Sequence, residues 1–216
     1  MIEKPSRHSL KNSYKSSTAQ NLVLLGSSFI PFFVLWIAAY QALAFSYTLS
    51  LLCALLASAF LVRIFIIQHD CGHSALFNKR QFNDWLGRFC SVLTIVPYDE
   101  WKRFHNIHHA TSGNLDKRGP GNVNTLTVDE FAALSATGQF FYRVYRNPYF
   151  LFIIAPILLF FILKRVPLDP PKNWVTERRG TWLTSIAIVL ALLFMGAMLG
   201  YEAVLLVHIP ILAFTS

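Results

Sequence analysis

Two long apolar runs near the start of the chain, Leu22–Leu43 and Tyr47–Ile67, restrict its possible folds more than any other feature. A helix rises about 1.5 Å per residue, so about twenty apolar residues cross a bilayer hydrocarbon core of roughly 30 Å. Only Ala44, Phe45 and Ser46 separate the two runs. Because so short a link joins neighbouring antiparallel spans, we expect a transmembrane helical hairpin.

Later apolar segments predict further membrane helices. Tyr149–Leu163 opens a third span, Trp182–Leu199 is long enough for another, and Tyr201–Phe214 begins one more. The run Trp85–Val96 is too short to cross and contains Arg88, which favours an interfacial or re-entrant helix. The expected fold class is all-α: a polytopic transmembrane helical bundle.

Composition agrees with this fold class. Of the 216 residues, 54% are hydrophobic and only 14% are charged, which is unlike an ordinary soluble domain. The net charge of +8 could indicate nucleic acid binding, but the basic residues flank the apolar runs, as topology signals and lipid headgroup contacts do. We expect a lipid bilayer as a partner and no nucleic acid.

The distribution of charge predicts domains and orientation. Residues 1–20 are polar with four basic residues and are interpreted as a tail, whereas residues 21–216 form one membrane domain. Cytoplasmic segments are enriched in Lys and Arg, so the N-terminus and the segment after the hairpin are expected in the cytoplasm. The basic linker Lys164–Thr181 would lie outside after a third crossing, against the same rule, and the topology after residue 164 stays open.

Five of the seven histidines lie within 41 residues, in two clusters. His69 and His73 are four positions apart. His105 is three and four positions before His108 and His109, so each cluster can gather its imidazoles on one helix face. Neutral imidazoles suit iron, copper or zinc, whereas calcium or magnesium would need clustered carboxylates. The spacing therefore predicts a transition-metal site.

The residues around these clusters resemble the membrane fatty acid desaturase family. The resemblance rests on the box His69-Asp70-Cys71-Gly72-His73, on Pro97–Phe104 leading into the box His105-Asn106-Ile107-His108-His109, and on the following Ala110–Asp116. It is closest to the acyl-lipid, Δ12-type (omega) branch and extends from about residue 20 to the last residue. Members of that family carry a third histidine box. Since this chain has only two, we expect a C-terminally truncated desaturase domain with little or no activity alone.

The resemblance implies a non-haem di-iron centre. Its expected protein ligands are His69, His73, His105, His108 and His109. The two Fe ions would use O2 to remove two hydrogens from an acyl chain and leave a cis double bond, with electrons from a separate ferredoxin or b-type cytochrome. The boxes would form a cytoplasmic cap on the membrane helices. Asp70 and Asp116 are expected to accept hydrogen bonds from the remaining N–H groups of ligand imidazoles.

Two alternatives stay open beside desaturation of an acyl lipid. A hydroxylase or ketolase with the same boxes would use the same iron chemistry but add an oxygen atom. A zinc-binding membrane transporter would need polar residues along its spans, and the runs hold few besides Arg63 and Glu202. The residues around the boxes favour desaturation.

Three residues near the boxes have more than one expected role. Arg63 can extend to the membrane interface or pair with Asp70. Trp101 and Phe104 can anchor the chain at the membrane interface or line a substrate channel. The sequence alone does not decide between these roles.

Other residues are expected to be structural. Cys71 lies two positions after His69 and so points to a different helix face, and His208 stands in an apolar run. Thr127–Glu130 has the spacing of a capping box and is followed by apolar residues at helical intervals. We expect one amphipathic helix on the membrane from this box to Asn147-Pro148.

Overall fold

The computed structural model describes residues 17–119, 123–168 and 170–215, and every regular element within these ranges is helical. The described chain divides into two compact units, residues 17–94 with Met195–Thr215 and Ile95–Phe194. The prediction of an all-α fold is confirmed for these residues. The predicted tail, residues 1–20, falls largely outside them, and it stays a prediction together with the single domain 21–216.

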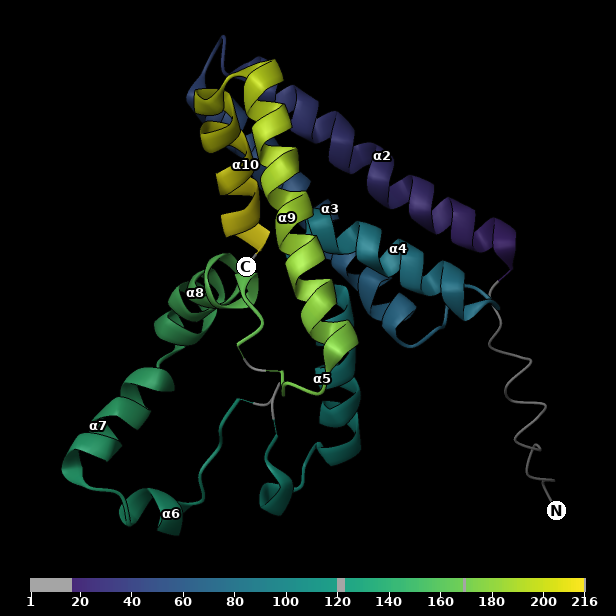
Figure 1. The fold of residues 1–216 in the computed structure, drawn as a ribbon. Helices are drawn as coiled ribbons and strands as arrows, with labels where there is room; N and C mark the ends of the chain where they lie inside the picture. Colours follow the sequence, from purple (N-terminus) through teal and green to yellow (C-terminus); the bar gives the residue numbers. More distant parts are fainter. Residues whose placement is uncertain (1–16, 120–122, 169, 216) are drawn as a thin grey trace, which may run out of the picture. The chain divides into compact units, whose positions relative to one another are not determined.

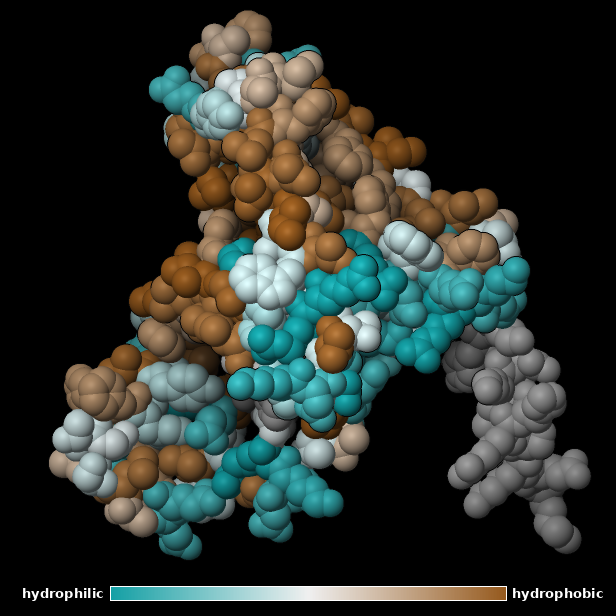
Figure 2. Space-filling view, viewed as in Figure 1, coloured by the Kyte–Doolittle hydropathy of each residue, from teal (hydrophilic) through white to brown (hydrophobic). Residues whose placement is uncertain are grey.

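Helices α2 (Thr18–Ala42) and α3 (Tyr47–Gly72) form the predicted hairpin (Figure 1). Ser17 and Gln20 form a capping box at the start of α2, and the Ser46 side chain caps α3. Both helices are long and apolar enough to cross a membrane. Hydrophobic residues cover α2 in Figure 2.

Small residues let α2 and α3 pack closely. Ala39, Ala54 and Ala57 are fully buried, and the Ser50 hydroxyl donates to the Ala39 carbonyl at 2.8 Å. In lipid, such close contacts and interhelical hydrogen bonds stabilise helix pairs, because lipid tails are as apolar as the side chains they would replace. The packing of the hairpin thus fixes the direction of α3, whose last turn carries the first histidine box.

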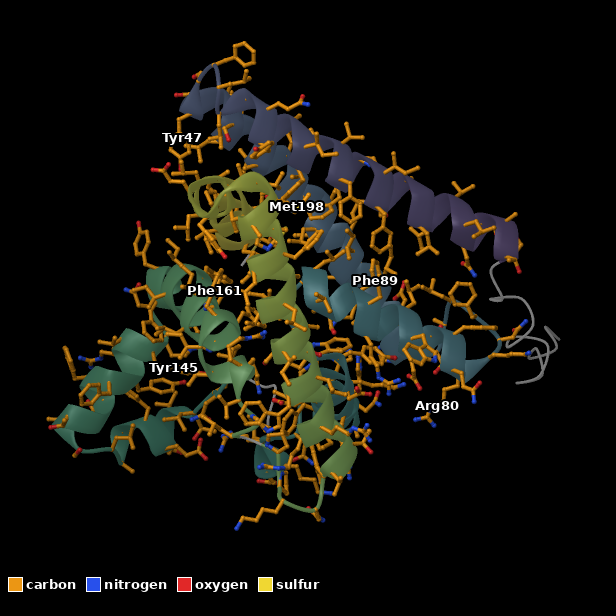
Figure 3. The ribbon with its side chains drawn as sticks, turned by 45° about the horizontal axis from the view of Figure 1, so that its top comes forward. Tyr47, Arg80, Phe89, Tyr145, Phe161 and Met198 are labelled. Atoms are coloured by element: carbon orange, nitrogen blue, oxygen red, sulfur yellow. The ribbon has the colours of Figure 1, made fainter. Side chains whose placement is uncertain are left out.

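Two further helices, α4 (Arg80–Leu93) and α10 (Tyr201–Thr215), pack against α3 in the same unit. Phe89 of α4, labelled in Figure 3, lies with its ring centroid 5.8 Å from that of Phe29 on α2. The helix expected over Trp85–Val96 therefore exists, but it begins earlier and ends before the segment that leads to the second box. As predicted, this helix is too short to span a bilayer.

The second unit contains the second box and a series of short helices. In chain order these are α5 (Tyr98–Thr111), the 3-10 helix η1 (Leu115–Lys117), α6 (Val128–Ala132), α7 (Ala136–Tyr145), the π-helix η2 (Phe150–Ile154), α8 (Ala155–Phe161), the 3-10 helix η3 (Leu163–Arg165), and α9 (Val175–Leu199), which begins in this unit. Among them, η2 contacts both α7 and α8.

The prediction of one amphipathic helix after Thr127 is wrong. The capping box of Thr127 and Glu130 is present, but the helix that it starts ends at Ala132. Ser135 then accepts a hydrogen bond from the Gly138 N–H and begins α7. A serine side chain that competes for backbone donors favours a new helix start over a helix interior.

Three described helices, α2, α3 and α9, are long and apolar enough to span a membrane. Helix α9 contains the predicted span Trp182–Leu199 and starts seven residues before it. The expected third span, Tyr149–Leu163, coincides with the helical segment Phe150–Arg165, which passes the same test only together with α7, from which it is bent by 57°. The molecule has four candidate spans if that bent pair is counted as one, within the part of the chain that the structure describes.

Candidate metal centre

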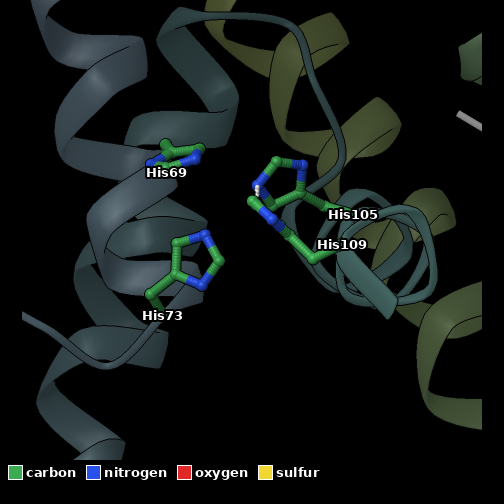
Figure 4. Close-up of side chains that lie close together, drawn as sticks. All are labelled: His69, His73, His105 and His109. Atoms are coloured by element: carbon green, nitrogen blue, oxygen red, sulfur yellow. Dashed lines mark hydrogen bonds between the residues drawn. The ribbon is translucent and has the colours of Figure 1, made fainter. Parts of the chain in front are cut away.

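The first histidine pair lies at the end of α3. His69 is in the last turn of the helix and His73 follows as its C-cap, so the spacing of four places their rings one above the other. The ring centroids are 4.6 Å apart, and each ring offers a nitrogen within 4.8 Å of one on the other (Figure 4). His69 is half-buried and His73 is exposed, which leaves the pair open to a ligand.

The neighbours of His69 have separate roles. Asp70 Oδ1 lies 3.2 Å from His69 Nδ1, the contact expected of a carboxylate that orients a ligand imidazole through its second nitrogen. Gln68 is fully buried and accepts a hydrogen bond from the Thr94 hydroxyl at 2.6 Å. Cys71 is fully buried as well, in agreement with its expected structural role. One face of this turn packs inward while another presents histidines.

Arg63 does not pair with Asp70, which was one of its two expected contacts. Its guanidinium donates to the hydroxyls of Ser28 and Ser27, at 3.3 and 3.2 Å. Arg63 lies six positions before His69, so the two side chains leave α3 on different faces. Arg63 therefore does not contribute to the histidine pair.

The second pair lies on α5 in the other unit. His105 Nε2 and His109 Nε2 are 2.9 Å apart and share a hydrogen bond, drawn as a dashed line in Figure 4. Two cis ligands at metal–nitrogen distances of about 2.05 Å are separated by roughly 2.9 Å when their bonds meet at a right angle. The pair therefore has the spacing of two ligands on one metal ion. His108 lies beside it, its ring centroid 6.1 Å from that of His105 and 5.8 Å from that of His109.

Trp101 stacks on the second pair. Its ring lies 4.5 Å from that of His105 with only 16° between the ring planes, because the two residues are one turn apart on the same helix. Stacking of this kind restricts rotation of the imidazole. This contact differs from both roles expected for Trp101, membrane contact and a channel wall, although the spacing of four from His105 is a signal for it. Phe104 is buried against Trp174, with ring centroids 5.2 Å apart.

The opposite face of α5 is held by a buried polar cluster that the sequence pattern does not predict. Glu100 is only 2% exposed. One carboxylate oxygen accepts a hydrogen bond from Lys164 Nζ at 2.6 Å, and the other accepts one from the Thr181 hydroxyl at 2.6 Å. Because Glu100 lies 500° of helical rotation before His105, the two side chains point to different sides of α5. The contacts with η3 and α9 can therefore fix the helix without entering the histidine face.

A second set of contacts joins α5 to the start of α9. Arg103 Nη1 lies 2.8 Å from Glu177 Oε1, and its guanidinium carbon is 3.9 Å from the Trp174 ring centroid. Gly180 faces Asp99 so closely that a Cβ there would lie 2.6 Å from a carboxylate oxygen. A larger residue at position 180 would force these two helices apart.

The loop after the second box is held by an exposed ion pair. Both carboxylate oxygens of Glu130 accept hydrogen bonds from Arg118, at 2.8 and 2.7 Å, and this bidentate contact lowers the pKa of Glu130 to about 2. Asp116 lies in η1, where its backbone N–H donates to the Asn114 side chain. The structure gives the Asp116 carboxylate no contact with a histidine among the described residues, and its expected role stays a prediction.

Neither histidine pair includes an atom of Cys53, Cys90 or His208. Burial, and secondly the nearby Cys71 thiol, raise the pKa of Cys90, so this side chain stays an uncharged thiol and a poor metal ligand. His208 is buried in α10, as expected for a structural residue. The described donors are thus imidazoles with one adjacent carboxylate, a set that fits iron, copper or zinc better than calcium or magnesium.

Comparison with known proteins identifies the family. The sequence model of the fatty acid desaturase family matches residues 42–216. A fatty acid desaturase of Bacillus subtilis is 44% identical over 194 residues, covering 90% of this chain and 54% of that protein. An sn-1 oleoyl-lipid 12-desaturase of Synechocystis is 31% identical over 85 residues, 39% of this chain and 24% of that protein.

A third relative, an sn-1 acyl-lipid omega-3 desaturase (ferredoxin) of Synechocystis, is 38% identical over 53 residues, 24% of this chain and 15% of that protein. The chain thus spans about half the length of its Bacillus subtilis relative and less of the others. No solved structure matches it. The match over most of the chain, the membrane helices and the two histidine boxes agree, and the chain belongs to the fatty acid desaturase family.

Proposed function

We propose that this chain forms the part of a membrane-bound acyl-lipid desaturase that carries the first two histidine boxes of a di-iron centre. The complete enzyme introduces a cis double bond into an acyl chain with O2 and an external electron donor. The observation that carries the proposal is the geometry of each box, in which two imidazoles four positions apart bring ring nitrogens within 4.8 Å of each other, in a chain of the desaturase family.

The proposed protein ligands come from both boxes. They are His69, His73, His105, His108 and His109. Breaking an unactivated C–H bond is beyond any amino-acid side chain, and the iron ions supply that oxidising chemistry when bound. The chain itself holds the imidazoles in fixed orientations. Asp70 orients His69 through its contact with Nδ1, and Trp101 orients His105 by stacking on its ring.

Electrons come from a separate protein in this proposal. One relative carries ferredoxin in its printed name, and we propose a ferredoxin or a b-type cytochrome as the donor. We propose that the N-terminus and both boxes lie on the cytoplasmic side, because basic residues surround them, and that the donor reaches the boxes from that side. A cysteine replacing Ala75 or Ser112 should react with a membrane-impermeant thiol reagent only after cells are permeabilised, with the unsubstituted chain as the blank. Labelling in intact cells would reverse this orientation.

The test of the function uses a desaturase-deficient host. The chain is expressed alone and joined to the part of the Bacillus subtilis relative that the alignment does not cover, and fatty acid profiles are compared by mass. The joined protein should produce acyl chains lighter by two hydrogens, and the His105→Ala version of it should produce none. Products that gain an oxygen atom would instead assign a hydroxylase, and tightly bound zinc without iron would contradict the proposal altogether.

A further inference from the structure

Arg63 is a charged residue within the apolar helix α3. It lies nine residues before the last residue of the helix, Gly72, or about 14 Å along the axis. Its neighbours Val62 and Ile66 are exposed, so this side of α3 faces the surroundings rather than the core of its unit. A charged side chain within a membrane span is costly unless it finds a partner, and such residues often mark a binding site.

The Arg63 side chain is held in place by α2. Nε donates to the buried Ser28 hydroxyl at 3.3 Å and Nη2 to the Ser27 hydroxyl at 3.2 Å. Each serine donates its own proton to the Leu24 carbonyl, at 2.8 Å for Ser28 and 3.2 Å for Ser27, so each hydroxyl oxygen is available as an acceptor. The guanidinium carbon also lies 5.9 Å from the Phe60 ring centroid. These contacts orient the guanidinium but bring no negative charge.

The charge of Arg63 has no counter-ion among the described residues. No carboxylate there forms an ion pair with it, and Asp70, the nearest acidic residue along α3, contacts His69 instead. A guanidinium has five N–H donors, and the two serines use two of them. Among the described residues, three donors in a rigid planar arrangement therefore remain for an anion.

The surroundings of Arg63 indicate where that anion comes from. Ile30 on α2 is 64% exposed and Ile66 on α3 is 52% exposed, so the guanidinium lies in an apolar surface of two candidate membrane helices. An anion that reaches this surface in a bilayer is the phosphate of a lipid headgroup. A guanidinium fork matches phosphate oxygens geometrically. A long arginine side chain can extend from this depth towards the headgroups.

We propose that Arg63, held by Ser27 and Ser28, binds the phosphate of an anionic phospholipid on the α2–α3 face. An anionic headgroup is preferred over a zwitterionic one because the latter brings an ammonium group that competes for its own phosphate. The bound lipid holds α2 against α3 from their lipid-facing surface. The site is separate from the histidine pair and is independent of the proposed desaturation.

The probe is phosphatidylglycerol, with phosphatidylcholine as the zwitterionic control, added to the purified 216-residue chain in detergent. Lipid adducts are counted by native mass spectrometry and thermal unfolding is followed in parallel. The wild-type chain should bind phosphatidylglycerol roughly fivefold more tightly than phosphatidylcholine, the effect of one basic residue near anionic lipid. Arg63→Gln should abolish this preference. The matched control Arg80→Gln should leave it unchanged, because Arg80 is exposed and already paired with Asp84.

The proposal would be overturned if the wild-type chain bound both lipids equally, or if the preference survived in Arg63→Gln. It would also be overturned if inorganic phosphate without lipid gave the same stabilisation, because that result would assign a site for free anions. If Arg63→Gln does not fold, Arg63→Lys keeps the charge and loses the fork. Its preference should then fall below that of the wild type, and an undiminished preference would equally contradict the proposed geometry.

Discussion

The two histidine boxes are held by different kinds of interaction. The first lies at the end of a 26-residue apolar helix packed on α2 through small buried residues. The second lies on α5, a 14-residue helix fixed by the buried Glu100–Lys164–Thr181 cluster and by an ion pair from Arg103. The position of the first box thus follows from hydrophobic helix packing, whereas that of the second depends on polar contacts from distant segments. A single substitution can therefore disturb the second box more easily.

The largest expected effect is shared by both boxes. Replacing His69 and His73 together, or His105 and His109 together, with Ala should lower bound iron to background and abolish desaturation in the joined protein. Membrane insertion should be unchanged, because the spans insert by hydrophobicity. Iron is measured by elemental analysis of purified protein, with His8→Ala as the control. Retention of iron by either double variant would show that the boxes are not equivalent.

Glu100→Ala should affect the two boxes differently. It leaves the Lys164 ammonium, which is mostly buried, without its carboxylate, and breaking such a pair costs about 3 kcal/mol. Chemical unfolding in detergent should show this loss, and iron binding should weaken with it. Glu177→Gln is the matched control, since the Arg103 side chain of that pair is 46% exposed; its cost should stay below about 1 kcal/mol. Similar costs for both variants would mean that the buried cluster does not hold α5.

Asp70→Asn tests the polar support of the first box. A hydrogen-bonded carboxylate next to a ligand imidazole typically contributes about tenfold or more to metal affinity, and Asp70 lies 3.2 Å from His69 Nδ1. We expect about a tenfold loss of affinity, measured by competition with a chelator. Asp116→Asn should change little, because its carboxylate does not contact a histidine in the described structure. An equal loss in both variants would restore the role first expected for Asp116.

The smallest effect concerns the loop after the second box. Arg118 lowers the pKa of Glu130 from its ordinary value of 4.5 to about 2. A lowered pKa in the folded state means that the contribution of this pair is present above pH 4.5 and is lost as the pH falls towards 2. Carboxyl chemical shifts of Glu130 should therefore titrate near pH 2. Arg118→Gln should return the midpoint towards 4.5, and a wild-type midpoint already near 4.5 would show that the pair does not persist in solution.

The local part of both the fold and the site could be predicted from the sequence. Apolar runs of membrane length gave the α2–α3 hairpin and most of α9, and the i, i+4 spacing gave the pairs His69–His73 and His105–His109. These features depend on helix geometry alone, which repeats every 3.6 residues whatever the surroundings. The stack of Trp101 on His105 belongs to the same class and was within reach of the same spacing argument.

Only the tertiary structure decided which partners the polar residues take. Glu100 meets Lys164 and Thr181 across 64 and 81 residues of chain, and Arg63 meets two serines on α2 instead of Asp70, seven residues away. Each choice depends on which helices pack together and on the cost of leaving a polar group unpaired in an apolar environment. Periodicity along the chain does not contain that information. The sequence by itself therefore determined where the imidazoles lie on their helices, and packing determined what holds those helices in place.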